Sequence, residues 1–406
     1  MSGYDLLDGI RVLEVAHLGP SALGGYLADM GADVVKVEDS EGELVRHGGS
    51  YAVGGPDGVG FMHLRWNRGK RSIGLDLKNV EGAKLFKQLV RSADVVIEGM
   101  RAGVLERLGL GYEVLRQINP RITFCSVSGM GSEGPYSKMA SHGTSFDAFG
   151  GLGAYSAYSA PKVGFDHPKR PSVGMHAVTL HAAVGTLSSV IRARRTGEGA
   201  RIEVAACDSA AHWMPDTLDP ALNESLLTGR PGHLSDSGKM TRWPLLHHYS
   251  TRDERQLFFM GRSAKSWAAF CDAIQRFDLA SAYQASENSG EADEQLFLSL
   301  TEIFRTRDRS QWMELFLDRG VPAVPVNSIA DLAEDIHFQA RDNLYEVEMA
   351  DVGKLQLTGT PIRVSNQHFA PTLAPERAEH SDDILMELLG LSTDEIGRLR
   401  TVGALV

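Results

Sequence analysis

Cysteine is scarce in this chain of 406 residues, and its distribution excludes two classes of site. The three cysteines, Cys125, Cys207 and Cys271, lie far apart and form no C-x-x-C pair. A disulfide framework needs an even set of cysteines at short spacings, and a thiolate zinc site needs paired ones. The sequence therefore predicts a cytoplasmic protein, kept in a reducing compartment, without disulfides.

Positive charge is also in deficit, since 41 Lys and Arg face 52 Asp and Glu for a formal net charge of −11. Nucleic acids and anionic membranes attract basic surfaces, so neither is expected as a partner. The N-terminus has no basic stretch leading into an apolar one, and no run approaches the roughly 18 apolar residues of a membrane span. An anionic ligand would need a local cluster of basic residues.

The common nucleotide and metal motifs are missing too. No G-x-G-x-x-G follows the first apolar run, and neither a Walker A motif nor H-E-x-x-H occurs. His176 and His181 stand five residues apart and do not share a helix face, as an i, i+4 ligand pair would. No metal is expected.

Glycine, by contrast, is abundant, with 43 residues spread along the chain. Short apolar runs rich in β-branched residues alternate with segments of helical periodicity, which predicts a doubly wound α/β fold with a mostly parallel sheet. The expected strands are 10–15, 33–38, 72–77, 94–98, 121–128 and 201–206, and the expected helices are 21–30, 80–92, 104–118 and 172–195.

The character of the sequence changes after residue 215. Residues 216–244 are rich in Pro, Gly and Asp with little periodicity, which favours a linker between domains. A chain longer than about 250–300 residues usually divides into two domains. Beyond the linker we expect a strand at 256–260 and helices at 266–277, 291–305 and 310–319.

Basic residues gather at the predicted strand ends. Residues 67–72 (NRGKRS) hold three cations, and Lys78, Arg101 and Arg107 follow. Such clusters suit phosphate recognition, although a solvated face would have the same composition.

Three further side chains are ambiguous at this level. His142, in a Gly/Ser loop, could be a general base or a structural residue. Asp147 and Asp166 have the same two interpretations, catalytic or structural.

Several ordered motifs resemble one family, the class III CoA-transferases. They are GIRVLEV, GADVVKVE, NRGKRSIGLDLK, ADVVIEGMRAGVLERLGLGYEVL, INPRITFCSVSGMGSEGPY and RRTGEGARIEVAACDSA, with a weaker match at VPAVPVNSIADL. This family includes formyl-CoA transferases, carnitine CoA-transferases and α-methylacyl-CoA racemases. The main match runs from about Leu7 to Ser209, which is about half of the chain, and the weaker match adds to it.

The resemblance implies a large Rossmann-like domain, here residues 1–215 with 330–406, and a smaller inserted α+β domain, residues 216–329. It also implies two subunits interlocked like chain links. In such transferases an aspartate takes the acyl group as a mixed anhydride and then holds CoA as a thioester, whereas racemases use a His and an Asp to exchange the proton α to the thioester.

The same resemblance places coenzyme A, as free CoA or acyl-CoA substrate, on matching positions of this chain. They are His17 in the loop after the first strand, Leu75 and Lys78 on the adenine side, Met100 and Arg101 after ADVVIE, and Arg107 at the diphosphate. These positions overlap the basic cluster described above.

Three positions depart from the family pattern. Asp39 stands where many members carry a nucleotide-binding arginine, and Gly143 replaces an acidic or amide residue beside His142. Met175 occupies the slot of the catalytic aspartate, with His176 next to it. Methionine cannot form an anhydride.

Two hypotheses therefore stand. The chain is the subunit without the aspartate in a heteromeric CoA-transferase, as in benzylsuccinate CoA-transferase, and a homologous chain supplies the carboxylate. Alternatively it works by itself, interlocked with a second copy, with altered catalytic residues around His142 and His176. It would then be an acyl-CoA racemase that uses His142 or a transferase whose nucleophile is Asp166. Residues 235–238 are the candidate for the family's glycine-rich active-site loop, within the segment that should shape the pocket for the organic acid.

Overall fold

A computed structural model describes residues 3–47, 52–55, 58–101, 103–152, 172–226, 244–281, 290–350 and 352–406. The chain divides into two compact units, Met1–Leu234 with Asn343–Val406, and Ser235–Asp342. Each unit is described by itself.

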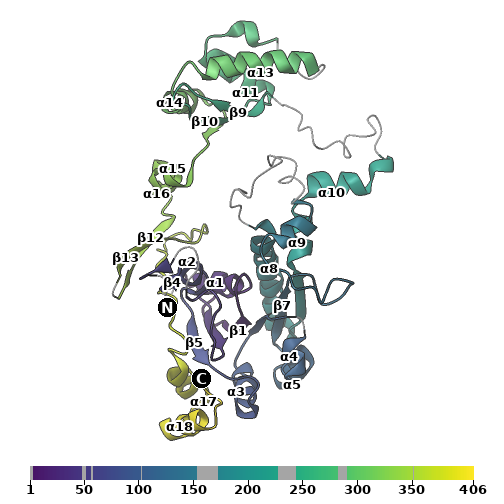
Figure 1. The fold of residues 1–406 in the computed structure, drawn as a ribbon, viewed down its shortest axis with the longest axis vertical. Helices are drawn as coiled ribbons and strands as arrows, with labels where there is room; N and C mark the ends of the chain where they lie inside the picture. Colours follow the sequence, from purple (N-terminus) through teal and green to yellow (C-terminus); the bar gives the residue numbers. More distant parts are fainter. Residues whose placement is uncertain are drawn as a thin grey trace. The chain divides into compact units, whose positions relative to one another are not determined.

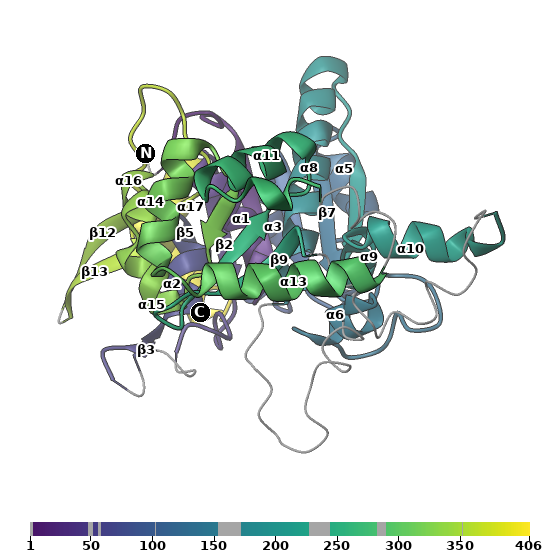
Figure 2. The same ribbon diagram turned by 90° about the horizontal axis from the view of Figure 1, so that it is seen from above.

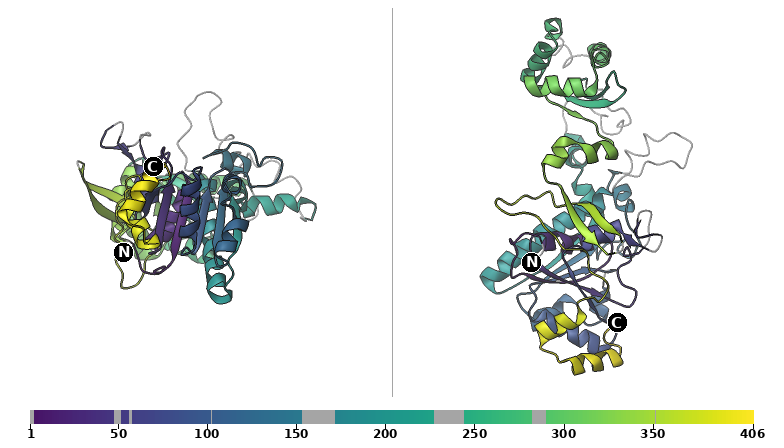
Figure 3. Two further views of the ribbon diagram at one scale, coloured as in Figure 1. Left: turned by 90° about the horizontal axis from the view of Figure 1, so that it is seen from below. Right: turned by 90° about the vertical axis from the view of Figure 1, so that its left-hand side faces the viewer.

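The large unit is built on a six-stranded sheet with the order β5-β2-β1-β6-β7-β8, and every neighbouring pair is parallel (Figures 1 and 3). Its central strands are almost continuously apolar because both faces of a parallel sheet are covered. This confirms the α/β fold expected from the sequence. The strands are β1 (Arg11–Ala16), β2 (Asp33–Glu38), β5 (Arg71–Gly74), β6 (Val95–Gly99), β7 (Thr123–Ser128) and β8 (Arg201–Ala205).

Alternate residues of each strand face two different layers of helices. In β1, Leu13 and Val15 join a core with α3, α4, α5, α17 and α18, whereas Val12 and Ala16 join a core with α1 and α8. The helices are α1 (Ser21–Asp29), α3 (Val80–Val90), α4 (Val104–Arg107), α5 (Tyr112–Ile118), α8 (Val173–Thr196), α17 (Ser381–Leu389) and α18 (Thr393–Thr401). The short helices α6 (Ser145–Phe149) and α9 (Ala206–His212) pack on α8.

Helix α8 is long and apolar enough to cross a membrane, by length and composition alone. No such segment was expected from the sequence. The helix packs against β7, β8 and α9, and its Ala177, Val178 and Ala182 are almost fully buried. Other apolar side chains of the same helix, Leu180, Val184 and Ile191, are exposed.

Three sequence predictions differ from the structure in this unit. The single helix expected at 104–118 is two helices, because Gly109 adopts a left-handed φ of 68° and Gly111 is the N-cap residue before α5. The strand expected at 72–77 ends at Gly74. The segment expected to be a linker begins with a helix, α10 (Pro215–Leu222), which has Pro at its first position.

The C-terminal part of the large unit returns to the N-terminal half. The hairpin of β12 (Leu344–Met349) and β13 (Gly353–Thr358) shares a core with Tyr4 and Leu64, and Leu75 pairs with Leu405 beyond β5. Helix α2 (Phe61–Asn67) and the hairpin β3 (Ala52–Val53) and β4 (Val59–Gly60), none of them expected from the sequence, lie between β2 and β5 in the chain.

The small unit contains a three-stranded antiparallel sheet in the order β11-β10-β9 and the helices α11, α13 and α14, which Figure 2 shows from above. Its core is rich in aromatic rings in mutual contact, such as Tyr249, Phe270 and Phe304. The predicted strand 256–260 is confirmed. The helix expected at 266–277 lies at 264–273. The elements are β9 (Leu246–Ser250), β10 (Gln256–Met260), α11 (Ala264–Ala273), α13 (Gly290–Phe304), α14 (Arg309–Arg319), β11 (Ala323–Pro325), α15 (Ile329–Glu334) and α16 (Ile336–Ala340).

Candidate functional site

The carboxyl ends of β5, β2, β1 and β6 meet at one edge of the sheet because these strands are parallel neighbours. His17 follows β1, Asp39 follows β2, Leu75 follows β5, and Met100 and Arg101 follow β6. The fold thus brings the residues matched to CoA binding to a single edge, which is where open α/β sheets bind their ligands.

The loop after β1 is strained and tightly held. Leu18 has a left-handed φ of 56°, which is uncommon for a residue with a Cβ atom, and its amide donates a 2.9 Å hydrogen bond to Glu43 Oε1. The ring of His17 is mostly buried, and its Nδ1 lies 3.9 Å from the same oxygen without forming a hydrogen bond to any described residue. Glu43 therefore organises this loop.

A buried ionic network lies beneath the loop. Lys36 on β2 donates to Glu14 Oε1 at 3.0 Å and contacts Glu43 Oε2 at 2.7 Å, and Lys70 lies 2.7 Å from Glu14 Oε2. All of these side chains are fully buried. Although burial would raise the pKa of Glu43, the Lys36 charge and the Leu18 amide lower it to about 2. The carboxylate is therefore ionised at neutral pH.

A second buried pair closes the end of β2. Arg46 binds both oxygens of Glu38, at 2.6 and 2.7 Å, and also donates to the Pro375 carbonyl at 2.6 Å. Burial, followed by the Arg46 charge, lowers the pKa of the adjacent His63 to about 3, so its imidazole is neutral.

The basic cluster at 67–72 has a different role from the one predicted. Arg68 pairs with Asp29 at 2.6 Å, Lys70 with Glu14, and Arg71 with Asp33 at 2.7 Å. Arg68 and Lys70 are buried, so these cations neutralise internal carboxylates instead of forming the phosphate site or the solvated face considered from the sequence. Composition alone cannot show this, because the partners come from β1, α1 and β2.

The other predicted cations remain available at the sheet edge. Lys78, Arg101 and Arg107 are exposed and form no ion pair with any residue that the structure describes. Leu75 is fully buried, and its amide donates to the Glu38 carbonyl at 2.9 Å, so the structure does not expose this predicted contact residue. Met100 is half-buried and packs on the neighbouring core.

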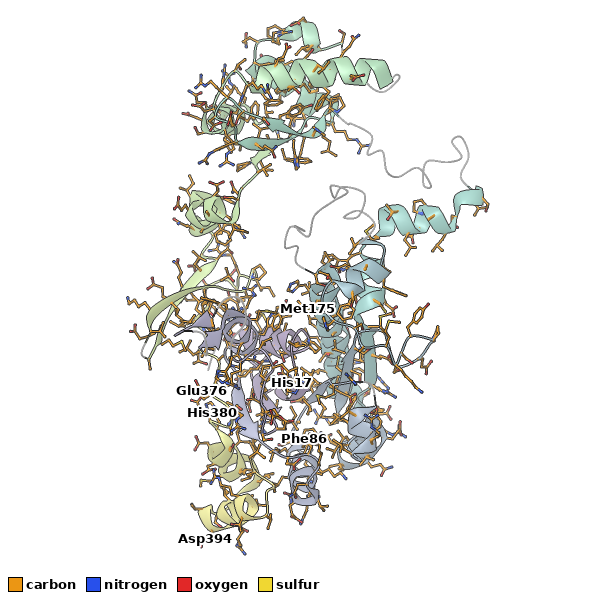
Figure 4. All side chains as sticks on the ribbon, in the orientation of Figure 1. His17, Phe86, Met175, Glu376, His380 and Asp394 are labelled. Carbon is orange, nitrogen blue, oxygen red and sulfur yellow. The ribbon has the colours of Figure 1, made fainter. Side chains whose placement is uncertain are left out.

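Met175 lies in the first turn of α8 and contacts the loop after β1. A Cβ atom added at Gly19 would lie only 2.7 Å from Met175 Cγ, so the glycine permits this close approach. Figure 4 labels Met175 on α8 and His17 beside β1. The residue in the slot of the family's aspartate is therefore a thioether that faces the predicted CoA-binding loop.

The N-terminus of α8 is capped from α6. Asp147 accepts hydrogen bonds from the Val173 amide at 3.0 Å and the Gly174 amide at 2.7 Å, and Ser172 Oγ donates to the Gly143 carbonyl at 2.8 Å. Asp147, ambiguous in the sequence, thus serves as a capping residue. The same contacts bring the loop of His142 to the start of α8.

The two histidines named from the sequence differ in environment. His142 is exposed, and its backbone amide donates to Ser145 Oγ at 3.0 Å. His176 is half-buried, and burial followed by the charge of Arg65 lowers the pKa of its imidazole. Asp166 and residues 235–238 lie outside the residues that the structure describes.

Asp39 is engaged in its own loop. Its Oδ1 accepts hydrogen bonds from the amides of Glu41 at 3.0 Å and Gly42 at 3.1 Å. Such a turn is a common role for aspartate.

The structure adds residues beneath the predicted site that sequence reasoning missed, above all Glu43 and the Glu14–Lys36 pair, which hold the loop after β1. A charged residue inside an apolar strand, as in RVLEVA and DVVKVE, is the sequence pattern that could have identified Glu14 and Lys36. No local pattern marks Glu43, whose partners lie on two other elements.

Comparison with known proteins gives concordant matches. The family model described as CoA-transferase family III matches residues 7–381. The chain is 30% identical to the succinyl-CoA–L-malate CoA-transferase beta subunit of Chloroflexus aurantiacus, over 97% of each protein. It is also 30% identical to the succinyl-CoA–L-malate CoA-transferase alpha subunit of the same species, over 97% of this chain and 91% of the relative.

A third relative is named as a single protein, the succinyl-CoA:mesaconate CoA-transferase of Haloarcula marismortui, with 31% identity over 94% of this chain and 96% of the relative. Among solved structures, a CAIB/BAIF family protein from Brucella suis matches with a TM-score of 0.72 and 29% identity, over 94% of this chain and 99% of that one.

Proposed function

Because the chain belongs to CoA-transferase family III, as its motifs predicted, we propose that it is the subunit without a nucleophilic carboxylate in a heteromeric CoA-transferase. The complex moves CoA from a donor such as succinyl-CoA to an organic acid in the cytoplasm. One observation carries the proposal: Met175, in the first turn of α8, faces the loop after β1. The two relatives named as alpha and beta subunits of one enzyme support a heteromer.

The reaction needs a carboxylate that this slot lacks. A carboxylate attacks the thioester carbonyl and expels the CoA thiolate, giving a mixed anhydride. The thiolate then attacks the enzyme's acyl carbon, which releases the donor acid and leaves an enzyme–CoA thioester. An acceptor carboxylate reverses these steps. The Met175 thioether has no oxygen for the first attack, and Asp147 already binds the amides of α8.

In this proposal the present chain binds CoA at the carboxyl edge of its sheet, and the homologous partner subunit supplies the nucleophilic carboxylate. His17 and the exposed Lys78, Arg101 and Arg107 provide donors and positive charge for a polyphosphate ligand. In an acidic protein such local charge decides where an anionic cofactor binds.

A racemase that uses His142 is the second candidate, and the link from Ser172 to the Gly143 carbonyl favours it. Proton exchange at an α-carbon requires a second acid or base on the opposite face. Among the described residues, the half-buried His176 is the available group in the first turn of α8, and its lowered pKa leaves it neutral.

The test introduces the missing carboxylate at Met175 and asks whether the enzyme–CoA thioester then forms. The purified full-length chain, alone, should not transfer CoA from succinyl-CoA to organic acids. Met175→Asp should form a hydroxylamine-sensitive enzyme–CoA thioester, detected by intact-protein mass spectrometry, whereas the near-isosteric Met175→Asn should not.

Robust transfer by the unmodified chain alone, abolished by Asp166→Asn, would contradict the subunit proposal. Deuterium exchange at the α-carbon of an acyl-CoA, lost in His142→Ala, would replace it with the racemase.

A further inference from the structure

Arg377 belongs to the C-terminal tail but lies against the loop that follows β2. Its guanidinium donates to the backbone carbonyl of Ser40, and its Cδ would lie 3.0 Å from a Cβ atom at Gly42. A cation from a distant part of the chain therefore lies on the loop where Asp39 stands. Figure 4 labels the nearby tail residues Glu376 and His380.

The backbone beside Arg377 is strained and fixed. Ala378 has a left-handed φ of 60°, a conformation that costs energy for any residue with a Cβ atom. Its amide donates to Ser72 Oγ at 2.9 Å, and the His380 amide donates to the Ser72 carbonyl at 2.9 Å. These bonds to β5 hold Arg377 over the carboxyl ends of β5 and β2.

The charge of Arg377 is not neutralised within the described parts of the chain. The side chain is exposed, and its hydrogen-bond partner is a neutral carbonyl. No described carboxylate lies within ion-pair distance, and Asp39 turns its Oδ1 toward the amides of Glu41 and Gly42. A guanidinium keeps further donors free beyond one bond to a carbonyl.

We propose that Arg377 binds the ribose phosphate monoester of CoA and so supplies the cation that the chain lacks at Asp39. The inference rests on the proposed function, which places CoA at this edge. Arg101 and Arg107 follow β6, whereas Arg377 and Lys78 lie at β2 and β5 on the other side of β1. CoA carries a diphosphate and a separate monoester, so two groups of cations at one edge match its two groups of phosphates.

The test compares CoA with 3′-dephospho-CoA, which lacks only this monoester, by isothermal titration of the full chain. The unmodified chain should bind CoA more tightly. Arg377→Gln should weaken CoA binding about tenfold and leave 3′-dephospho-CoA binding unchanged, because a charge-assisted bond to the monoester is lost. Arg377→Lys, which keeps the charge, should retain part of the preference.

Arg121→Gln is the matched control, since this exposed arginine precedes β7 at the opposite edge of the sheet. It should change neither affinity. If Arg377→Gln lowers the affinity for CoA and for 3′-dephospho-CoA equally, Arg377 has a purely structural role and the inference is overturned. The inference is also overturned if Arg377→Gln leaves both affinities unchanged, or if the unmodified chain does not bind CoA. A preference for CoA over 3′-dephospho-CoA that is lost in Arg377→Gln would support this inference even if Met175→Asp formed no enzyme–CoA thioester. The two proposals can therefore fail separately.

Discussion

Glu43 is the residue through which the buried network reaches the predicted CoA-binding loop, and it makes stability sensitive to acid. Its pKa of about 2 in the folded protein compares with 4.5 for an ordinary glutamate. The unfolded chain therefore takes up the proton first as the pH falls, and the free energy of unfolding should drop between about pH 5 and pH 2, by roughly 3 kcal/mol from this residue. His63, with a pKa of about 3 against 6.5, adds a loss of the same sign below pH 6.5.

Urea denaturation at a series of pH values checks this prediction. Glu43→Gln should be less stable at pH 7, because Lys36 loses a partner, and should show a shallower dependence below pH 5. Glu113→Gln, which removes an exposed partner of Arg116, should keep the slope of the unmodified protein. An unchanged slope in Glu43→Gln would show that another group carries the acid sensitivity.

For single residues, the sequence predicted where they lie in the fold better than what their side chains bind. The strand-end residues His17, Met100 and Arg101 do gather at one edge, since parallel topology follows from the alternation of strands and helices. The roles of Arg68 and Lys70 were wrong because their carboxylate partners are distant in the sequence. Arg377 was missed for the same reason.

Among the elements, α8 depends on a cap from α6. Asp147 satisfies amides of Val173 and Gly174 that have no partner within the helix. We expect Asp147→Ala to lower the free energy of unfolding by about 1–2 kcal/mol and to speed amide exchange in the first turn of α8. Because Ser172 links this turn to Gly143, exchange should also rise in the loop of His142.

Asp147→Asn is the matched variant, since its amide oxygen can still accept one hydrogen bond, and it should lose less stability. Hydrogen exchange read by mass spectrometry resolves the segments. If Asp147→Ala leaves exchange at α8 unaltered, the cap does not order this turn.

Strands and helices with a strong local pattern were predictable, and those set by context were not. The apolar runs at 33–38 and 256–260 match β2 and β10. The break between α4 and α5 was missed because a glycine within a helical pattern is often tolerated, and only the left-handed φ of Gly109 reveals the stop. Helix α2 was missed because its buried face packs against elements that the local sequence does not specify.

At the scale of the whole large unit, the tail completes the core of the N-terminal sheet. Leu385 on α17 and Leu405 share a cluster with Ile73 of β5 and Phe86 of α3. This pairing of the two ends of the chain cannot be derived from local periodicity, because its contacts join residues about 300 positions apart in the sequence. One example is the 2.9 Å hydrogen bond from the Ala378 amide to Ser72 Oγ, which spans 306 positions. The family resemblance implied it, and the packing explains it.

The tail and the N-terminal sheet should therefore unfold together. Leu385 is fully buried, so Leu385→Ala should lower the free energy of unfolding by about 2–5 kcal/mol through lost contacts and the cavity left behind. Met386→Ala, one residue along the same helix at a side chain that is 39% exposed, should cost far less. Hydrogen exchange at the amides of β1, β2 and β5 should rise in Leu385→Ala by the same free energy as in α17, since one cooperative core links them. A rise confined to α17 and α18 would mean that the tail opens separately and that the sheet is stable without it.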